Sequence, residues 1–396
     1  MTNRIRLSYP IYLFAFSRPL YFERALHQWY TLLFLGVDSM VLHLSKKEIL
    51  ARTMERSGLL KLTSALKGTS CILPILTYHR VVDIHPPDYL FDEEVVSASV
   101  EMFDRQIAFI KQNFNCLTFA NLKNALDKNA SLPGHPLIVT FDDGYADNFH
   151  NAFPILKRHG VPATFFVSTD YMGTKNQFWW EKVVYWIKQG QISETVLKDF
   201  EPRRASAAGS ERPAGVAPLA GIAPPLSPEA IRWLKGLDNT DRLEMLELWE
   251  QAYPIDGNIE MILPLNWDQI RTMSESGMEI GSHTVTHPNL SKLSKIALHD
   301  ELISSKQKIE KEIGKEVICV AYPGGKSTDH NALVHRAAEE AGYLFGLAYE
   351  GGVNPLAHLE RYQLKRMSVE RSDSVALFQS SLLFPRLFSY SWKKGG

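Results

Sequence analysis

Short apolar runs alternate with helix-like stretches along most of this 396-residue chain, and this alternation restricts the folds available to it. Ile72–Tyr78, Leu137–Phe141 and Ala163–Val167 have the length and composition of buried strands. Between the first two, apolar residues recur at helical spacing over Phe103–Phe114. Alternating strands and helices are typical of a parallel sheet or barrel, whose functional side chains lie at the C-terminal ends of its strands.

Capping signals extend the alternation toward the C-terminus. Asp147–His159 is predicted to be a helix that Gly160 ends. Ser294 is a suitable N-cap for a helix that runs to Ile313, and a strand is predicted over Val317–Tyr322.

Two short polar motifs follow strand-like runs and carry complementary types of metal ligand. Asp142 and Asp143 come directly after an apolar run and Gly144 closes the turn, whereas His283 and His287 stand four residues apart. One carboxylate and two imidazoles suit a zinc-like ion and leave room for water, while the other carboxylate is free to act as a base. Taken singly, the motifs are also compatible with a polar turn and with unrelated surface histidines. Together they indicate a metal-assisted hydrolase.

At these residues the chain resembles the polysaccharide deacetylase family, the NodB-homology or carbohydrate esterase family 4 enzymes. The resemblance covers most of the chain and rests on motifs in the expected order: ILTYHRV (75–81), VTFDDGYADN (139–148), GVPATFFVS (160–168), EIGSHTVTHPNL (279–290), AYPGG (321–325) and LKRMSV (364–369). It implies an α/β fold, an irregular and incomplete (β/α) barrel of the NodB-homology type. It also implies that Asp142 is the catalytic base and that Asp143, His283 and His287 hold one divalent metal ion, for which zinc is expected.

Hydrolysis of an amide also needs contacts for the oxyanion and an acid for the leaving amine. Backbone N–H groups near Gly324 are candidates for the oxyanion, and Tyr145 and Pro323 are further candidates for contacts with the substrate. Many relatives take the acid from a histidine in a late Leu-x-His motif, which has no clean equivalent in this chain. His358 and His79 are the candidates for the general acid, and a structural role is equally open for each.

A second departure from the family pattern concerns the arginine that orients the base aspartate. Ala321 stands where many relatives carry this arginine. We expect Arg366, in the late motif LKRMSV, to replace it as a catalytic residue beside Asp142, because a guanidinium offers a carboxylate two parallel donors. The alternative is a surface arginine paired with Glu370.

The chain is predicted to divide into three parts. Residues 1–70 form a helical extension, residues 71–371 a deacetylase-like domain, and residues 372–396 a C-terminal tail. A long insertion, residues 178–262, interrupts the domain between two motifs. Within it, residues 203–225 are rich in Ala, Gly and Pro without apolar periodicity, which is typical of a disordered loop.

The insertion also contains aromatic residues that fit two roles. Trp179 and Trp180 open a helix with an apolar face, and Ser227 begins another helix. The two tryptophans fit a wall on which a sugar stacks, but anchoring of the insertion to the barrel is the favoured interpretation. Trp267 is likewise interpreted as a packing residue at the start of a helix.

Charge and cysteine content restrict the binding partners and the compartment that are expected for this chain. A net charge of −1 gives no electrostatic footprint for nucleic acid. The sequence contains three cysteines, Cys71, Cys116 and Cys319, which lie far apart and form no CxxC pair. This usage favours a reducing compartment, although it is also compatible with one disulfide bond.

The N-terminal part carries an apolar segment. Trp29–Leu44 contains Asp38 and is shorter than a spanning helix, and no secretory signal is evident. A core or interfacial helix is expected, with peripheral membrane contact as the less favoured alternative. A third interpretation is that the residues before Met40 precede the true start. A cytoplasmic location is therefore predicted.

The function predicted from the sequence is a metal-dependent hydrolase that removes N-acetyl groups from amino sugars of a polysaccharide or glycan precursor. Its partner is then an N-acetylated glycan. The first alternative keeps the metal and acts on a small non-sugar amide. The second is a catalytically silent carbohydrate-binding scaffold, against which the intact motif residues argue.

Overall fold

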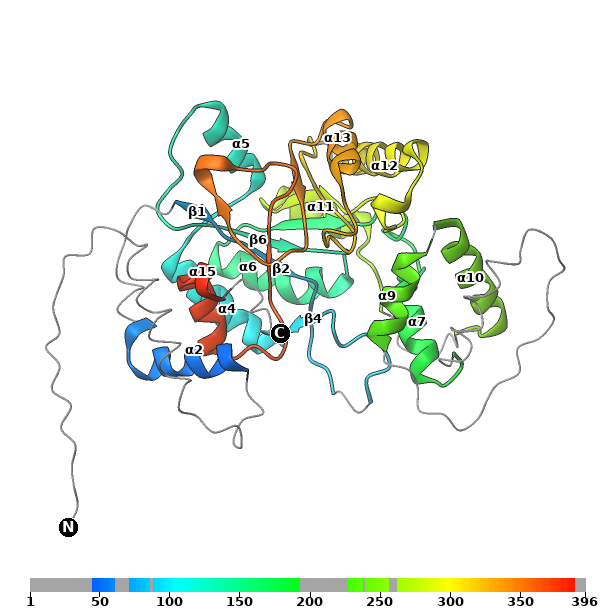
Figure 1. The fold of residues 1–396 in the computed structure, drawn as a ribbon, viewed down its shortest axis with the longest axis horizontal. Coiled ribbons are helices and arrows are strands. Elements are labelled where there is room, and N and C mark those ends of the chain that lie inside the picture. Colours follow the sequence, from blue (N-terminus) through cyan, green and yellow to red (C-terminus); the bar gives the residue numbers. More distant parts are fainter. Residues whose placement is uncertain are drawn as a thin grey trace, which may run out of the picture.

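A curled sheet of parallel strands forms the centre of the structure, a computed structural model that describes residues 45–60, 71–85, 88–192, 227–237, 239–255 and 262–388 (Figure 1). The strands follow the order β10-β9-β8-β7-β6-β2-β12, and β5 pairs with the start of β6. The strand bounds are β1 (Ile72–Leu73), β2 (Ile75–Tyr78), β3 (Arg80–Val81), β4 (Val96–Ala98), β5 (Asn115–Leu117), β6 (Pro136–Phe141), β7 (Thr164–Val167), β8 (Glu279–Ser282), β9 (Cys319–Ala321), β10 (Phe345–Leu347), β11 (Asn354–Pro355) and β12 (Met367–Ser368). The predicted α/β fold, an irregular barrel of the NodB-homology type, is confirmed.

One segment near the C-terminus contacts both edges of the curled sheet. Leu347, in the edge strand β10, bridges Leu364 in parallel. Slightly further along the chain, Met367 in β12 pairs with Leu76 in β2. The chain between these two contacts therefore places Arg366 between the edges of the barrel.

Helices cover the outside of the sheet, and several begin and end at the predicted signals. Their bounds are α2 (Lys46–Arg56), α4 (Val100–Asn113), α5 (Phe119–Asp127), α6 (Phe153–His159), α7 (Trp179–Lys188), α9 (Ser227–Gly236), α10 (Asn239–Ala252), α11 (Trp267–Glu275), α12 (Lys295–Ile313), α13 (Ala332–Glu340), α14 (Val375–Leu383) and α15 (Pro385–Phe388), with the shorter η2 (Asn148–Ala152), η4 (Leu290–Lys292) and η5 (Leu356–His358). In α12, the Ser294 side chain accepts from the Ala297 N–H, and Gly314 ends the helix at φ 65°. The helix predicted before Gly160 starts instead as the π-helical η2 and continues as α6.

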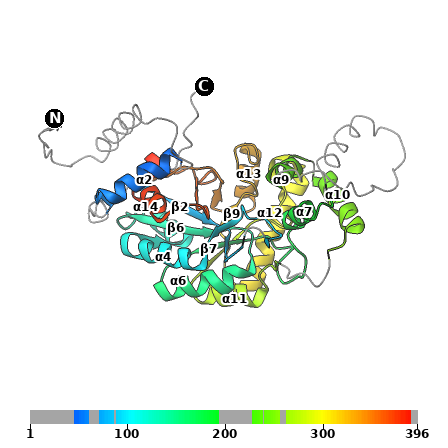
Figure 2. The same cartoon turned by 90° about the horizontal axis from the view of Figure 1, so that it is seen from below.

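Two peripheral groups of helices lie at opposite ends of the barrel (Figure 2). The insertion contributes α7, α9 and α10 at one end. At the other end, Ala51 and Met54 of α2 pack against Ala376 of α14 and Leu387 of α15. The segment expected as a C-terminal tail therefore carries helices that pack against the N-terminal extension.

Some predictions concern residues outside the part that the structure describes. These are the apolar segment Trp29–Leu44 and the loop over residues 203–225. Among the described helices, none combines the length and the apolarity that crossing a membrane requires.

Candidate active site

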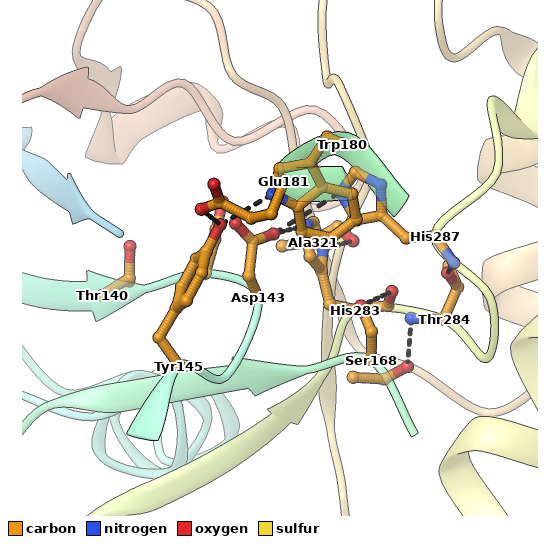
Figure 3. A network of polar contacts seen from close by, with 12 residues as sticks. Thr140, Asp143, Tyr145, Ser168, Trp180, Glu181, His283, Thr284, His287 and Ala321 are labelled. Carbon is orange, nitrogen blue, oxygen red and sulfur yellow. Dashed lines mark hydrogen bonds and ion pairs between the residues drawn. The ribbon is translucent and has the colours of Figure 1, made fainter. Parts of the chain in front are cut away.

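The three predicted metal ligands meet at the C-terminal edge of the sheet. Asp143 follows β6 and His283 follows β8, and both strands pair in parallel with β7 between them. The Asp143 Oδ1 atom lies 3.4 Å from His283 Nε2 and 3.5 Å from His287 Nε2 (Figure 3). All three side chains are buried, and their ligand atoms lie within 4.8 Å of one another. Side chains that are distant in the sequence thus form one compact donor set.

A tight turn brings the two imidazoles to the same side of the sheet. Thr284 and His287 adopt φ angles of 69° and 57°, and Asp143 adopts 74°, all in the left-handed region that non-glycine residues rarely occupy. The Thr284 hydroxyl accepts from the His287 N–H at 3.2 Å, and the Ser282 hydroxyl accepts from the Thr284 N–H at 3.1 Å. These bonds hold the turn in its unusual backbone conformation.

Hydrogen bonding and burial leave both imidazoles suited to bind a cation. The His283 Nδ1 atom lies 2.8 Å from the carbonyl oxygen of Ala321, which can only accept, so Nδ1 carries the proton and Nε2 keeps its lone pair. Burial and the neighbouring His283 hold the pKa of His287 well below its usual value. The Trp180 ring covers His287, with 4.4 Å between the ring centroids. Two neutral imidazoles and one carboxylate fit a zinc-like divalent ion.

The adjacent carboxylate, Asp142, is held by Arg366. The arginine Nη1 donates to Asp142 Oδ1 at 2.7 Å and Nη2 donates to Oδ2 at 2.8 Å, while Nε donates to the carbonyl of Ala348 at 2.8 Å. Burial alone would raise the pKa of Asp142, but Arg366 and His283 outweigh it and hold the pKa below its usual value. Arg366 is 1% exposed and points at Asp142 rather than at Glu370. The contact between Arg366 and Asp142 that the sequence predicts is therefore present in the structure.

The cavity lined by Asp142, Asp143, His283 and His287 has a volume of about 510 Å³, within the range of small-molecule sites. Of the other predicted site residues, His79 and Gly324 line this cavity, and Pro323 lines a small hollow beside it. His358 lies on η5 with an exposed side chain, and it is not among the residues that line the cavity. The structure thus brings His79, and not His358, to the site.

His79 lies beside the base because β2 and β6 are paired. The Asp142 N–H donates to the carbonyl of Tyr78, the last residue of β2, at 2.9 Å. The imidazole of His79, the next residue, lies edge-on to Tyr349, with 5.6 Å between the ring centroids. The His79 N–H donates to the hydroxyl of Ser97, which fixes the backbone at the cavity wall.

Tyr145 lies beneath the cavity rather than on its surface. Its hydroxyl donates to Glu181 Oε1 at 2.9 Å and accepts from the indole N–H of Trp180 at 2.6 Å (Figure 3). The side chain is completely buried, because the turn that follows Asp143 directs it toward the insertion. Its hydroxyl therefore supports Trp180 and has no direct path to a bound substrate.

A buried ionic network that the sequence did not predict joins the insertion to the barrel. Glu181 on α7 accepts from the Asp92 N–H at 2.9 Å and lies 3.9 Å from Arg80, whose Nε donates to Asp147 at 2.8 Å. Burial raises the pKa of Glu181 to about 7, although Arg80 opposes this shift. The sequence carried one signal for this network, because Glu181 is a charged residue within an otherwise apolar helix face. The network supports the predicted anchoring role of the tryptophans, while Trp180 also lines the cavity.

Comparison with known proteins places this architecture in a known class. The family model described as polysaccharide deacetylase matches residues 129–196 and 241–346, which include the metal-ligand motifs. The protein YxkH of Bacillus subtilis, which bears the same family name, is 20% identical over 281 residues, covering 71% of this chain and 65% of that protein. The chain belongs to the polysaccharide deacetylase family.

Two further comparisons concern better-described proteins. Poly-beta-1,6-N-acetyl-D-glucosamine N-deacetylase of Staphylococcus aureus is 34% identical over 110 residues, covering 26% of this chain and 37% of that protein. The Streptococcus pyogenes deacetylase PplD, solved with acetate, superimposes with a TM-score of 0.51 at 19% identity, covering 81% of this chain and 98% of PplD. The chain thus spans less than two thirds of the length of these curated relatives, and its likeness to PplD concerns the fold.

The prediction of a cytoplasmic location is wrong. The Staphylococcus aureus relative is named for a polysaccharide substrate, poly-beta-1,6-N-acetyl-D-glucosamine, and similarity to a polysaccharide modifier points away from the cytoplasm. The prediction rested on weak signals, since three unpaired cysteines do not identify a compartment.

Proposed function

We propose that this protein removes N-acetyl groups from the amino sugars of a polysaccharide or glycan precursor, with the help of one divalent metal ion. The observation that carries the proposal is the pairing of two units in one cavity. The first unit is the donor set Asp143, His283 and His287, and the second is the carboxylate of Asp142 clamped by Arg366. Membership of the polysaccharide deacetylase family supports the choice of reaction.

The donor set would hold the ion through the Asp143 carboxylate and the two Nε2 atoms. A bound dication supplies Lewis acidity, which polarises the acetyl carbonyl and brings the pKa of water toward about 7. The protein contributes the orientation of the ligands, since the proton on His283 Nδ1 is committed to Ala321.

Asp142 takes the proton from the attacking water. Its pKa lies below the usual value, so the carboxylate is ionised and ready to accept at neutral pH. Arg366 fixes both carboxylate oxygens and so restricts the direction from which the proton arrives. The backbone near Gly324, which lines the same cavity, is suited to contact the oxyanion.

His79 gives a proton to the amine nitrogen as the bond between this nitrogen and the carbonyl carbon breaks. It is the candidate acid that lines the cavity, beside the base. This transfer releases acetate and leaves a free amino sugar. The His79→Ala variant should therefore lose about 10²–10⁴-fold in turnover of N-acetyl sugars and less with an amide whose leaving amine needs no proton.

The test measures acetate released from N-acetylglucosamine oligomers by the zinc-loaded protein. Asp142→Asn should lower release by about 10²–10⁴-fold, and the same change at exposed Asp300 on α12 should leave it intact. Release that depends on metal and on Asp142 supports the proposal. Metal binding without release from any N-acetyl sugar, together with cleavage of small non-sugar amides, would refute the substrate assignment.

A further inference from the structure

The insertion contributes a cationic side chain to the catalytic cavity. Lys235, on the last turn of α9, lines the cavity together with Asp143 and Trp180, and it also lines the small hollow against His287. Asn289 holds this end of α9 in place, because its Nδ2 atom lies 3.3 Å from the carbonyl oxygen of Lys235. A residue far from the catalytic motifs in the sequence therefore forms part of the wall around the metal ligands.

The positive charge of the Lys235 ammonium group is not balanced by a paired carboxylate in the described part of the chain. Burial lowers its pKa, and the attraction of Asp143, Asp92 and Asp329 does not offset this effect. Among the described residues, none places a carboxylate within ion-pair distance of the Lys235 Nζ atom. Lys235 is half-buried, and a cation that has lost part of its hydration without gaining a paired carboxylate can be stabilised by a bound anion.

Nearby carboxylates already have other partners. Asp329 accepts from the Asn289 side chain at 3.0 Å and from the Lys326 N–H at 3.1 Å. Asp92 accepts from the Glu94 N–H at 2.9 Å. Under the proposed function Asp143 coordinates the metal, so its charge is neutralised when the site is loaded. Each of these three carboxylates therefore has a partner other than the Lys235 ammonium group.

Two more lysines extend the positive charge toward solvent. Lys292 and Lys326 line the mouth of the same cavity with exposed side chains. In the part of the chain that the structure describes, neither ammonium group forms an ion pair with a carboxylate. Lys235, Lys292 and Lys326 thus reach the cavity from three separate elements, α9, η4 and the loop after β9.

We propose that Lys235, assisted by Lys292 and Lys326, binds an anionic group, a carboxylate or a phosphate, on the amino sugar or on the residue next to it. The inference rests on the proposed function and deepens it, because it names acidic N-acetylated glycans or glycan phosphates as the substrate class. A charge-assisted contact of this kind discriminates by about 10–100-fold between an anionic substrate and its neutral analogue.

The experiment compares kcat/KM for three substrates of the zinc-loaded enzyme. These are neutral N,N′-diacetylchitobiose, N-acetylmuramic acid as the carboxylate, and N-acetylglucosamine 1-phosphate as the phosphate. Lys235→Met removes the charge and keeps the length, Lys235→Arg keeps the charge, and Lys311→Met makes the same change on the exposed surface of α12. Direct binding of each compound to the zinc-loaded protein is measured by calorimetry, independently of turnover.

We expect Lys235→Met to lose about 10–100-fold in kcat/KM for one anionic substrate and less than about 3-fold for the neutral one, with Lys235→Arg close to wild type. The anion that shows the loss identifies the chemical source. Equal losses on all three substrates, or no loss, would overturn the inference while leaving the deacetylase proposal in place. If no acetate is released from any substrate but anion binding still depends on Lys235, the deacetylase proposal fails and the anion site stands.

Discussion

Replacement of Arg366 by lysine tests whether the fork of the guanidinium, rather than its charge, supports catalysis. Arg366 donates at 2.7 and 2.8 Å to the two oxygens of Asp142, and Nε donates to Ala348 at 2.8 Å. A single ammonium nitrogen cannot span both oxygens, so at least one charge-assisted hydrogen bond is lost. Such a bond contributes about 1.5–3 kcal/mol, which corresponds to about 10–150-fold in turnover.

The assay follows acetate release, bound zinc and melting temperature for wild type and Arg366→Lys. Turnover should fall by about 10–150-fold while zinc remains stoichiometric, because Arg366 holds the base and touches no metal ligand directly. Arg336→Lys, an exposed change on α13, is the matched control. Lysine is preferable to alanine, since an unpaired buried Asp142 destabilises a fold by about 3–5 kcal/mol. Wild-type kinetics in Arg366→Lys with full metal content would refute the positioning argument.

Three further predictions follow from the site. His283→Ala should lose bound metal and activity together, and elemental analysis that finds a full equivalent of metal would contradict the assigned ligand set. Asp142→Asn should lower turnover by about 10²–10⁴-fold with metal retained, whereas Asp143→Asn should lower metal occupancy; the reverse pattern would mean that the two roles are exchanged. Burial raises the pKa of Glu181 from 4.5 to about 7, so between these values the folded protein holds a proton that the unfolded chain has released. The free energy of unfolding should therefore fall as the pH rises through this window, by about 3 kcal/mol relative to Glu181→Gln, and parallel denaturation profiles for the two proteins would argue against this.

The meeting of the candidate metal ligands was predictable from sequence because local pattern and topology agree. Asp143 and His283 each follow a short apolar run, and parallel strands bring the ends of such runs to one edge of a sheet. Arg366 was predictable for a similar reason, since the last strand of a nearly closed barrel returns beside the first strand. In these cases the backbone alone determines which side chains meet.

The remaining contacts depend on how the insertion docks, which no local pattern encodes. Lys235 lies on a helix whose apolar spacing predicts burial of one face but not which barrel residues that face meets. Glu181 has its partners in distant loops. His358 was a candidate only as a lone histidine in a late segment, and the exposed η5 holds it away from the cavity. The sequence therefore predicted which candidate side chains meet at the sheet edge, but not the residues of the insertion that surround them.

The left-handed backbone at Asp143 and His287 has a consequence for how this site changes over generations. Each of these conformations costs on the order of 1 kcal/mol, and glycine would adopt it without that cost. A lineage under no demand for the reaction would therefore gain stability by exchanging a ligand for glycine, whereas a lineage that needs the reaction must tolerate the less stable fold. We expect homologues that lack a ligand at these positions to melt at higher temperatures than active ones, so that loss of the site records relaxed selection rather than damage to the barrel.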